Sequence, residues 1–248
     1  MRKNLLYFLL LFASLLSAQN GFEKGNALYR KEQYAEAVTA YENVLKTKKH
    51  SAELYFNLGN AYYKLNKVAP AIYNYEKALL LAPTDPDIKT NLRFAHKMMI
   101  DEVKEVPKVG FRKIVSDFTS AFSYNGWAWL AVSCAIGFLL FFCGYYFSGQ
   151  TLVKRLFFFG MIALALVILL SVFAAIFEKD RYESERPAIV FAAAAPVKGE
   201  PKSSAADEVV LHEGTKVYVL ESLENWRKVE LPDGATGWME SSAIKEVK

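Results

Sequence analysis

The chain has 248 residues, a formal net charge of +4 at pH 7 and 53% hydrophobic residues, which gather in blocks and so indicate several parts. The small positive charge forms no basic stripe with interleaved aromatic residues, so no nucleic-acid partner is predicted. Both cysteines, Cys134 and Cys143, fall in one apolar run, which leaves the rest of the chain without thiols for a disulfide or a zinc site.

Residues 1–18 have the composition of a secretory signal peptide. Arg2 and Lys3 form a basic start, the stretch from Leu5 to Leu16 is apolar, and Ser17-Ala18 precede the expected cleavage site. The apolar stretch is short for a membrane span. An uncleaved anchor is the alternative, and in both cases the residues that follow are sent across a membrane.

A pattern with a period of 34 residues runs through residues 19–102. Gly25-Asn26-Ala27 recurs as Gly59-Asn60-Ala61, and the same offset relates Ala37 to Ala71, Tyr41 to Tyr75, Glu42 to Glu76 and Leu45 to Leu79. With Pro83, this pattern resembles the tetratricopeptide repeat, a pair of helices that stacks into a solenoid. The resemblance predicts repeats at about 21–51 and 52–83, a capping helix over 85–100, and binding of other proteins.

The first helix of each repeat lines a groove in such a solenoid. The resemblance therefore predicts a partner-binding groove formed by Phe22, Asn26, Tyr29, Phe56, Asn57, Asn60 and Tyr63. Asn26 and Asn57 match two asparagines of the carboxylate clamp with which some repeat proteins hold the C-terminus of a partner. The basic residues of that clamp are missing, because Phe22, Asp87 and Asn91 stand in their places. An apolar or aromatic peptide is thus the favoured ligand, and a C-terminal carboxylate is the alternative.

Residues 103–126 are predicted to be a linker that contains an amphipathic helix. Apolar and polar residues take opposite faces at helical spacing, with Phe111, Ile114, Val115, Phe118, Ala121 and Phe122 against Arg112, Lys113, Ser116 and Asp117. We expect this helix to lie in the membrane interface. Packing of the same face against the solenoid is the alternative.

Two apolar runs, 127–147 and 156–177, contain no charged residue. At about 1.5 Å per residue, each reaches roughly 30 Å and is predicted to span a membrane. Residues 148–155 form the turn between them, and Lys154 and Arg155 place that turn in the cytoplasm under the positive-inside rule. The export signal and two spans then put both flanking parts on the outer side of the membrane.

A second linker over 178–186 precedes a C-terminal part, residues 187–248, with the composition of short strands. Pro232-Asp233-Gly234 predicts a tight hairpin between two of them. Four short motifs resemble a bacterial SH3-like domain, a small all-β barrel: Gly214-x-x-Val217, Trp226-x-x-Val229, Asp233-Gly234 and Gly237-Trp238. Trp226 and Trp238 are interpreted as parts of the barrel core, and a ligand platform on the barrel surface is the alternative.

No catalytic arrangement is visible in the chain. His50, His96 and His212 fall in separate elements, and no nucleophile elbow, phosphate-binding loop or cysteine-histidine pair accompanies them. We therefore predict that the protein is not an enzyme and has no cofactor and no metal site.

The order of the parts is a multi-domain fold: an all-α tetratricopeptide solenoid, a two-helix transmembrane hairpin and a small all-β SH3-like barrel. This order resembles the BatE-like members of the Bacteroides aerotolerance (Bat) set. The resemblance implies an inner-membrane scaffold with both terminal domains in the periplasm, linked to aerotolerance or stress resistance. It also implies partners among the other Bat proteins, several of which carry von Willebrand factor A domains. A peptidoglycan-binding sensor or tether and a regulatory subunit of a transporter are the alternatives.

Overall fold

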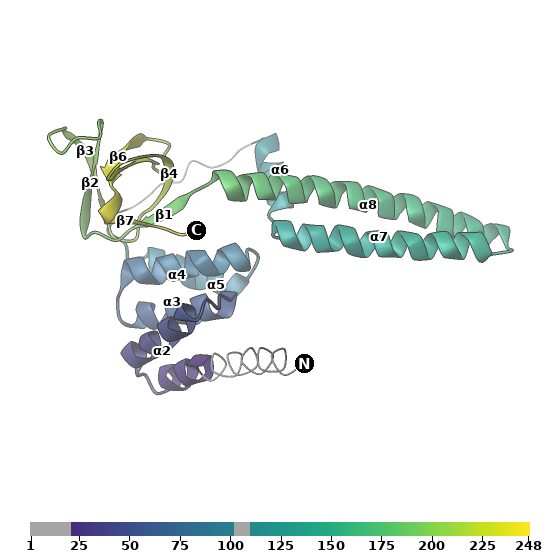
Figure 1. The fold of residues 1–248 in the computed structure, drawn as a ribbon, viewed down its shortest axis with the longest axis horizontal. Coiled ribbons are helices and arrows are strands. Elements are labelled where there is room, and N and C mark those ends of the chain that lie inside the picture. The colour runs from purple at the N-terminus through teal and green to yellow at the C-terminus, as the bar shows by residue number, and fades with distance from the viewer. Residues whose placement is uncertain (1–20, 102–109) are drawn as a thin grey trace, which may run out of the picture. The chain divides into compact units, whose positions relative to one another are not determined.

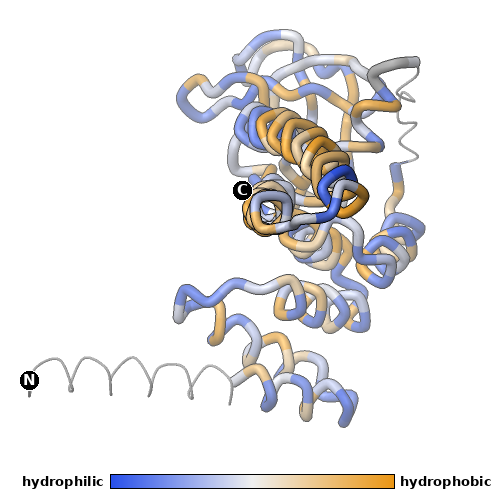
Figure 2. The backbone as a smooth tube through the Cα atoms, turned by 90° about the vertical axis from the view of Figure 1, so that its right-hand side faces the viewer, coloured by the Kyte–Doolittle hydropathy of each residue, from blue (hydrophilic) through white to orange (hydrophobic). Residues whose placement is uncertain are grey.

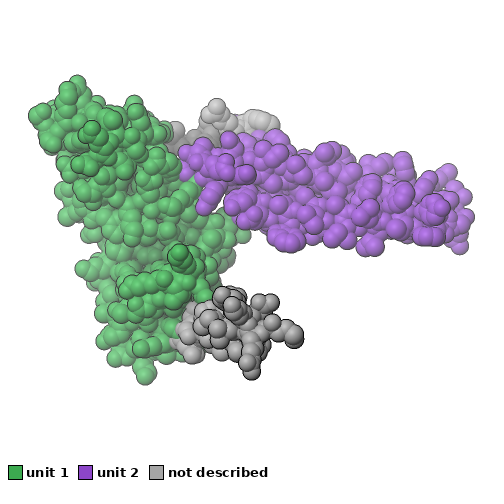
Figure 3. All heavy atoms as spheres, in the orientation of Figure 1, with its two compact units in different colours: residues 1–106, 186–248 green, residues 107–185 purple. Residues whose placement is uncertain are grey.

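The computed structural model describes residues 21–101 and 110–248, so the predicted signal peptide and part of the first linker lie outside the described residues. The chain divides into two compact units (Figure 3). One unit joins Met1–Val106 with Arg186–Lys248, and the other comprises Pro107–Glu185. The expected fold class is confirmed, because a helical repeat region, two long apolar helices and an antiparallel sheet follow one another along the chain.

The repeat region consists of paired helices (Figure 1). They are a helix over residues 21–30, α2 (Tyr34–Lys46), α3 (Ala52–Lys64), α4 (Val68–Leu81) and α5 (Pro86–His96). Side-chain caps explain where two of them begin. The Ser51 hydroxyl accepts the amide of Leu54 at the start of α3, and the Asp85 carboxylate accepts two amides at the start of α5. α5 ends at His96, earlier than the expected capping helix, and the turn that follows leads to Asp101.

A glycine and a tyrosine meet inside each repeat. A Cβ atom at Gly59 would lie 2.8 Å from the ring of Tyr75, and one at Gly25 would overlap the ring of Tyr41. Both tyrosines are 1% exposed. The glycines of the repeat pattern are therefore needed because the helix backbones approach each other closely around a buried ring.

Seven strands form the C-terminal sheet: β1 (Pro187–Val190), β2 (Ala194–Lys198), β3 (Asp207–His212), β4 (Lys216–Leu223), β5 (Trp226–Glu230), β6 (Thr236–Glu240) and β7 (Ile244–Glu246). Their order is β3-β2-β6-β5-β4-β1-β7, and neighbouring strands pair antiparallel. The predicted hairpin joins β5 and β6, with Gly234 at φ +88° in its turn. Inward side chains such as Val197, Val217, Val229 and Met239 form the barrel core.

The barrel packs against the repeat region and completes its hydrophobic core. Ile189 of β1 and Val247, which are 0% and 1% exposed, belong to one cluster with Val68, Ile72 and Tyr73 of α4. β1 is buried on both faces, since the neighbours of Ile189 along the strand point into the barrel core instead. No sequence pattern predicted this contact, which joins the repeat region and the barrel in one unit.

Hydrogen bonds and an ion pair also join the barrel to the repeat region. The Asp101 carboxylate accepts hydrogen bonds from the His212 amide at 2.7 Å and from the Thr215 hydroxyl at 2.6 Å, and it contacts the His212 imidazole at 2.7 Å. Lys216 donates to Glu76 of α4 at 2.7 Å. Gly214 lies between these groups with φ +95°, where a Cβ atom would come within 3.1 Å of three side chains of the repeat region. Only glycine combines that backbone conformation with so close an approach.

The second unit is a helical hairpin preceded by the amphipathic helix α6 (Phe111–Thr119). α7 (Tyr124–Phe147) and α8 (Thr151–Ser184) are long and apolar enough to cross a membrane, and hydrophobic colour predominates along the hairpin in Figure 2. At the start of α7, the Trp127 indole donates to the Thr119 carbonyl at 2.7 Å, and the ring of Phe118 lies 5.2 Å away. Part of the apolar face of α6 thus packs on its own hairpin.

The ends of α8 differ from the expectation. The helix begins at Thr151, so the turn over 148–155 shortens to residues 148–150 and Lys154 and Arg155 lie in the first helical turns. It also continues to Ser184, through most of the segment expected to be a linker. That segment has no proline or glycine to stop a helix, and ion pairs one turn apart support it, as between Lys179 and Glu183 at 3.7 Å.

Candidate protein-binding groove and barrel face

Asparagine and tyrosine side chains form the same network in both repeats. Asn26 Oδ1 accepts from the Tyr41 hydroxyl at 2.8 Å and from Asn57 Nδ2 at 3.0 Å. Asn60 Oδ1 accepts from the Tyr75 hydroxyl at 2.7 Å and from Asn91 Nδ2 at 2.8 Å. All three positions of the second set lie 34 residues after those of the first, so the repeat period extends to these hydrogen bonds.

The network fixes the orientation of the asparagine amides. Burial, followed by the nearby Tyr29, raises the pKa of Tyr41 to about 12, and burial is also the main cause that raises the pKa of Tyr75. Both hydroxyls therefore keep their protons at physiological pH and act as donors. Because each asparagine oxygen already accepts two hydrogen bonds, the amide nitrogens of Asn26 and Asn60 remain available as donors. Asn91, which stands where the carboxylate clamp has a basic residue, donates a hydrogen bond within this network instead.

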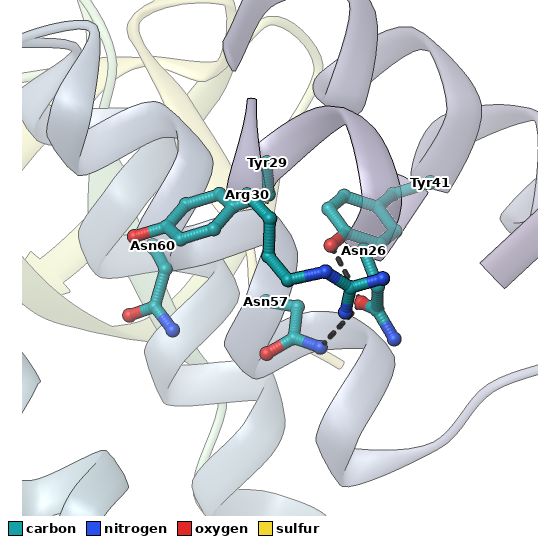
Figure 4. Close-up of a pocket in the computed structure, with 6 residues that line it drawn as sticks. All are labelled: Asn26, Tyr29, Arg30, Tyr41, Asn57 and Asn60. Carbon is teal, nitrogen blue, oxygen red and sulfur yellow. Dashed lines mark hydrogen bonds between the residues drawn. The ribbon is translucent and has the colours of Figure 1, made fainter. Parts of the chain in front are cut away.

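A pocket of about 130 Å³ opens beside this network (Figure 4). Its lining comprises four of the predicted groove residues together with two that sequence reasoning had not assigned to the groove: Asn26, Tyr29, Asn57 and Asn60, with Arg30 and Tyr41. Arg30 is the important addition because it brings a positive charge to a site from which the clamp lysines are missing. Arg30 follows Asn26 by one helical turn, and this spacing alone predicts that the two side chains lie on the same face of the helix.

The other three predicted groove residues, Phe22, Phe56 and Tyr63, are not part of the pocket lining. Phe22 contacts the ring of Tyr41, and Phe56 contacts the ring of Tyr75, with centroids 6.0 Å apart in each case. All three are partly buried and pack against the repeat core. These rings therefore contribute to folding whatever else they contact.

Trp226 and Trp238 lie outside the barrel core, so their interpretation as core residues is wrong. Both are partly exposed, and neither belongs to the buried cluster of the barrel. The register explains this: Trp238 pairs with Lys228, and the side chains that alternate with them, Val229 and Met239, point into the core. Trp226 and Trp238 consequently share the outer face of β5 and β6.

The histidine and acidic side chains were also compared with the requirements of a metal site. Within residues 21–101 and 110–248, no group of three or more His, Cys, Asp or Glu side chains is placed to hold a metal ion. His50 stacks on Tyr55, and His212 contacts Asp101. Burial by itself raises the pKa of Asp101, but the hydrogen bonds from His212 and Thr215 outweigh it, and the net pKa is lowered.

Comparison with known families agrees with this architecture. Two models of the tetratricopeptide repeat match residues 25–66 and 52–85, and the bacterial SH3 domain model matches residues 193–246. No curated protein matches the chain. The helical region therefore carries tetratricopeptide repeats, and the C-terminal barrel is an SH3-like domain. Both are modules that typically bind other molecules rather than catalyse reactions.

Proposed function

We propose that this protein is a membrane-anchored scaffold whose tetratricopeptide groove binds a segment of another protein. The observation that carries the proposal is the pocket of Asn26, Arg30 and Asn57, where polar donors lie beside the ring of Tyr29. Such a lining suits an extended peptide, because amide groups can bind its polar atoms while aromatic rings contact its side chains.

The packing of the barrel on the solenoid supports a single-sided topology. The two soluble parts share a hydrophobic core at Ile189 and Val247, so they must lie on the same side of any membrane. An even number of spans between them satisfies this requirement, and α7 and α8 supply two. With the predicted export signal, we place both parts in the periplasm of a bacterial inner membrane.

The order of modules suggests the class of partner. By resemblance to the BatE-like proteins, we propose that the groove binds other Bat proteins, including members with von Willebrand factor A domains, in an inner-membrane complex. A role in aerotolerance or stress resistance follows from the same resemblance.

The groove can be tested by affinity purification of the tagged full chain in mild detergent, followed by mass spectrometry. The double variant Arg30→Ala/Asn57→Ala removes two side chains of the pocket lining and should lose proteins recovered with the wild type. A matched control, Leu81→Ala/Leu220→Ala, removes two side chains that are each 50% exposed outside the groove. Circular dichroism must show unchanged helicity in both variants. Equal recovery by all three proteins would refute the groove as the binding site.

The outer face of the barrel supports a second candidate, binding of peptidoglycan. Trp226 and Trp238 share that face, and partly exposed aromatic rings are suited to stacking on sugar rings. The match to the bacterial SH3 domain model is consistent with a cell-wall ligand.

This candidate predicts saturable sedimentation of the detergent-solubilised full chain with isolated peptidoglycan. Trp238→Ala should weaken it, whereas Leu220→Ala, at an exposed position of β4, should leave it unchanged. Wild-type protein that stays in the supernatant would exclude the wall as a ligand and leave the groove proposal intact.

A further inference from the structure

We infer that two lysines at the contact between solenoid and barrel, Lys77 and Lys245, bind the phosphate of an anionic phospholipid at the membrane surface; this inference rests on the proposed membrane anchor and not on the groove. Lys77 belongs to α4 and Lys245 to β7, so each module supplies one half of the site. The Nζ atoms of Lys245 and Lys77 lie 4.5 Å and 5.3 Å from the centroid of the Tyr73 ring. Two positive charges therefore converge on one ring.

Aromatic rings hold both ammonium groups in place. Lys77 Nζ also lies 5.5 Å from the ring centroid of Tyr55. Lys245 Nζ lies 5.7 Å from that of Phe191, whose ring meets Tyr73 edge to face. Tyr55 and Tyr73 are 7% and 8% exposed, so the lysines rest on a nearly buried aromatic base. The negative face of a ring attracts a cation, but the ring has no net charge, and the two positive charges remain uncompensated.

No carboxylate neutralises these two lysines among the residues that the structure describes. Nine ion pairs within 4.0 Å occur there, and neither lysine takes part in any of them. Burial, followed by the charge of Lys245, lowers the pKa of Lys77. Because the second positive charge disfavours the charged form of the first, an anion bound beside both would remove a repulsion that the folded protein otherwise retains.

A phosphate is the anion that suits this arrangement. Each lysine offers three N–H donors on a flexible stem and acts as a compact point charge, whereas the planar fork of an arginine matches a planar carboxylate. The charged oxygens of a phosphodiester point in different directions from a tetrahedral phosphorus. Two ammonium groups that come from separate modules can therefore each donate to the same phosphate.

The covalent chain holds this site close to the membrane. Lys245 pairs with Ile189 in β1, and two residues separate β1 from the end of α8. The five residues from the end of α8 to Ile189 reach at most about 18 Å when fully extended. Residues 178–184 of α8 follow the apolar run, and at about 1.5 Å each they cross the headgroup layer. A site on so short a tether favours a lipid phosphate over a soluble one.

Lysine acetylation of the full chain in nanodiscs, quantified for each lysine by mass spectrometry, tests the inference. One set of nanodiscs contains only phosphatidylcholine, and in the other about a quarter of the lipid is phosphatidylglycerol. A bound phosphate covers the amine and favours its protonated form. Acetylation of Lys77 and Lys245 should therefore slow at least about fivefold in the second set. Lys64 and Lys89, which are exposed on α3 and α5, serve as internal controls and should keep nearly the same rate.

A pair of matched variants measures the affinity of the site. Lys77→Gln/Lys245→Gln should bind dioctanoyl phosphatidylglycerol about 30-fold more weakly than the wild type, in native mass spectrometry of the full chain from a neutral detergent. Lys64→Gln/Lys89→Gln removes the same charge elsewhere and should keep the wild-type affinity. Circular dichroism must show the same helicity in all three proteins.

Three results would overturn the site: unchanged acetylation of both lysines in the anionic nanodiscs, equal slowing at every lysine, or equal lipid affinity of the three proteins. Protection by glycerol phosphate or by a polyglutamate peptide in neutral nanodiscs, without protection by phosphatidylglycerol, would overturn the lipid as its occupant. All of these results would leave the groove proposal standing, because neither lysine lines the groove pocket.

Discussion

The contact between barrel and solenoid makes a quantitative prediction about Ile189. This side chain belongs to the barrel strand β1, yet it is 0% exposed and packs in the cluster of α4. Ile189→Ala leaves a cavity between two rigid surfaces, and such a change in a protein core costs about 2–5 kcal/mol. That is a large part of the roughly 5–15 kcal/mol by which a domain is stable.

The assay is denaturant unfolding of the full chain in detergent, with amide hydrogen exchange of α4 measured by mass spectrometry. A loss of about 2 kcal/mol or more should raise the open population of α4 at least about 30-fold, because each 1.4 kcal/mol is a factor of ten. Val209→Ala is the control, since this aliphatic residue of the barrel is 40% exposed and its change should stay within about 0.5 kcal/mol.

The opposite result would refute the shared core. If the two modules were independent, Ile189 would occupy an exposed face of β1, and its substitution would affect α4 no more than Val209→Ala does. The shared core also means that deletion of the whole barrel would expose Val68, Ile72 and Tyr73 to water. Loss of a partner after that deletion would then report damage to the solenoid as well as removal of the barrel.

Three further predictions concern topology, pH and a glycine. Alkaline phosphatase should be active when fused at the C-terminus and inactive in the loop at 148–150, and activity only in that loop would invert the topology. The lowered pKa of Asp101 stabilises the folded state above the ordinary carboxyl pKa of 3.8, and this contribution is lost as the pH falls through the folded-state value. The difference in melting temperature between wild type and Asp101→Asn should therefore shrink from pH 7 towards pH 3, and a constant difference would contradict it. Gly214→Ala should destabilise the protein by more than Gly234→Ala in thermal melts, because both glycines have positive φ but only Gly214 has side chains within 4 Å of the added methyl group; equal losses would show that the contact is unimportant.

Local patterns were sufficient to predict the modules. The period of 34 residues marks helix pairs because a glycine must face a tyrosine in each, as Gly25 and Gly59 do. Uncharged runs of membrane-spanning length marked α7 and α8, and Pro232-Asp233-Gly234 marked the hairpin between β5 and β6. In each case, the determining interactions lie close together along the chain.

Strand alternation alone is sufficient to place the two tryptophans of the barrel. Trp226 and Val229 are three residues apart, so on a regular strand they face opposite sides and cannot both be in the core. Trp238 and Met239 are adjacent, so they also face opposite sides of their strand. Burial of one member of each pair therefore places the other on the surface.

The groove residues illustrate the limit of sequence patterns. An asparagine in a repeat is compatible with either orientation of its amide, and Arg30 is compatible with any solvent-exposed surface. The orientation of the Asn26 amide depends on Tyr41 and Asn57, 15 and 31 residues away, which both donate to its Oδ1 and leave its nitrogen to the pocket. This arrangement exists only after the helices have packed.

The amino-acid sequence by itself determined which kinds of module the chain contains and their order, because repeat period, apolar length and turn residues act over short distances. The tertiary structure decided that the first and last modules form one body. Asp101 meets His212 across 111 residues of chain, and Ile189 joins a core made by α4. No periodicity predicts such a contact, since it depends on the shape and charge of two surfaces that are complete only when each module has folded.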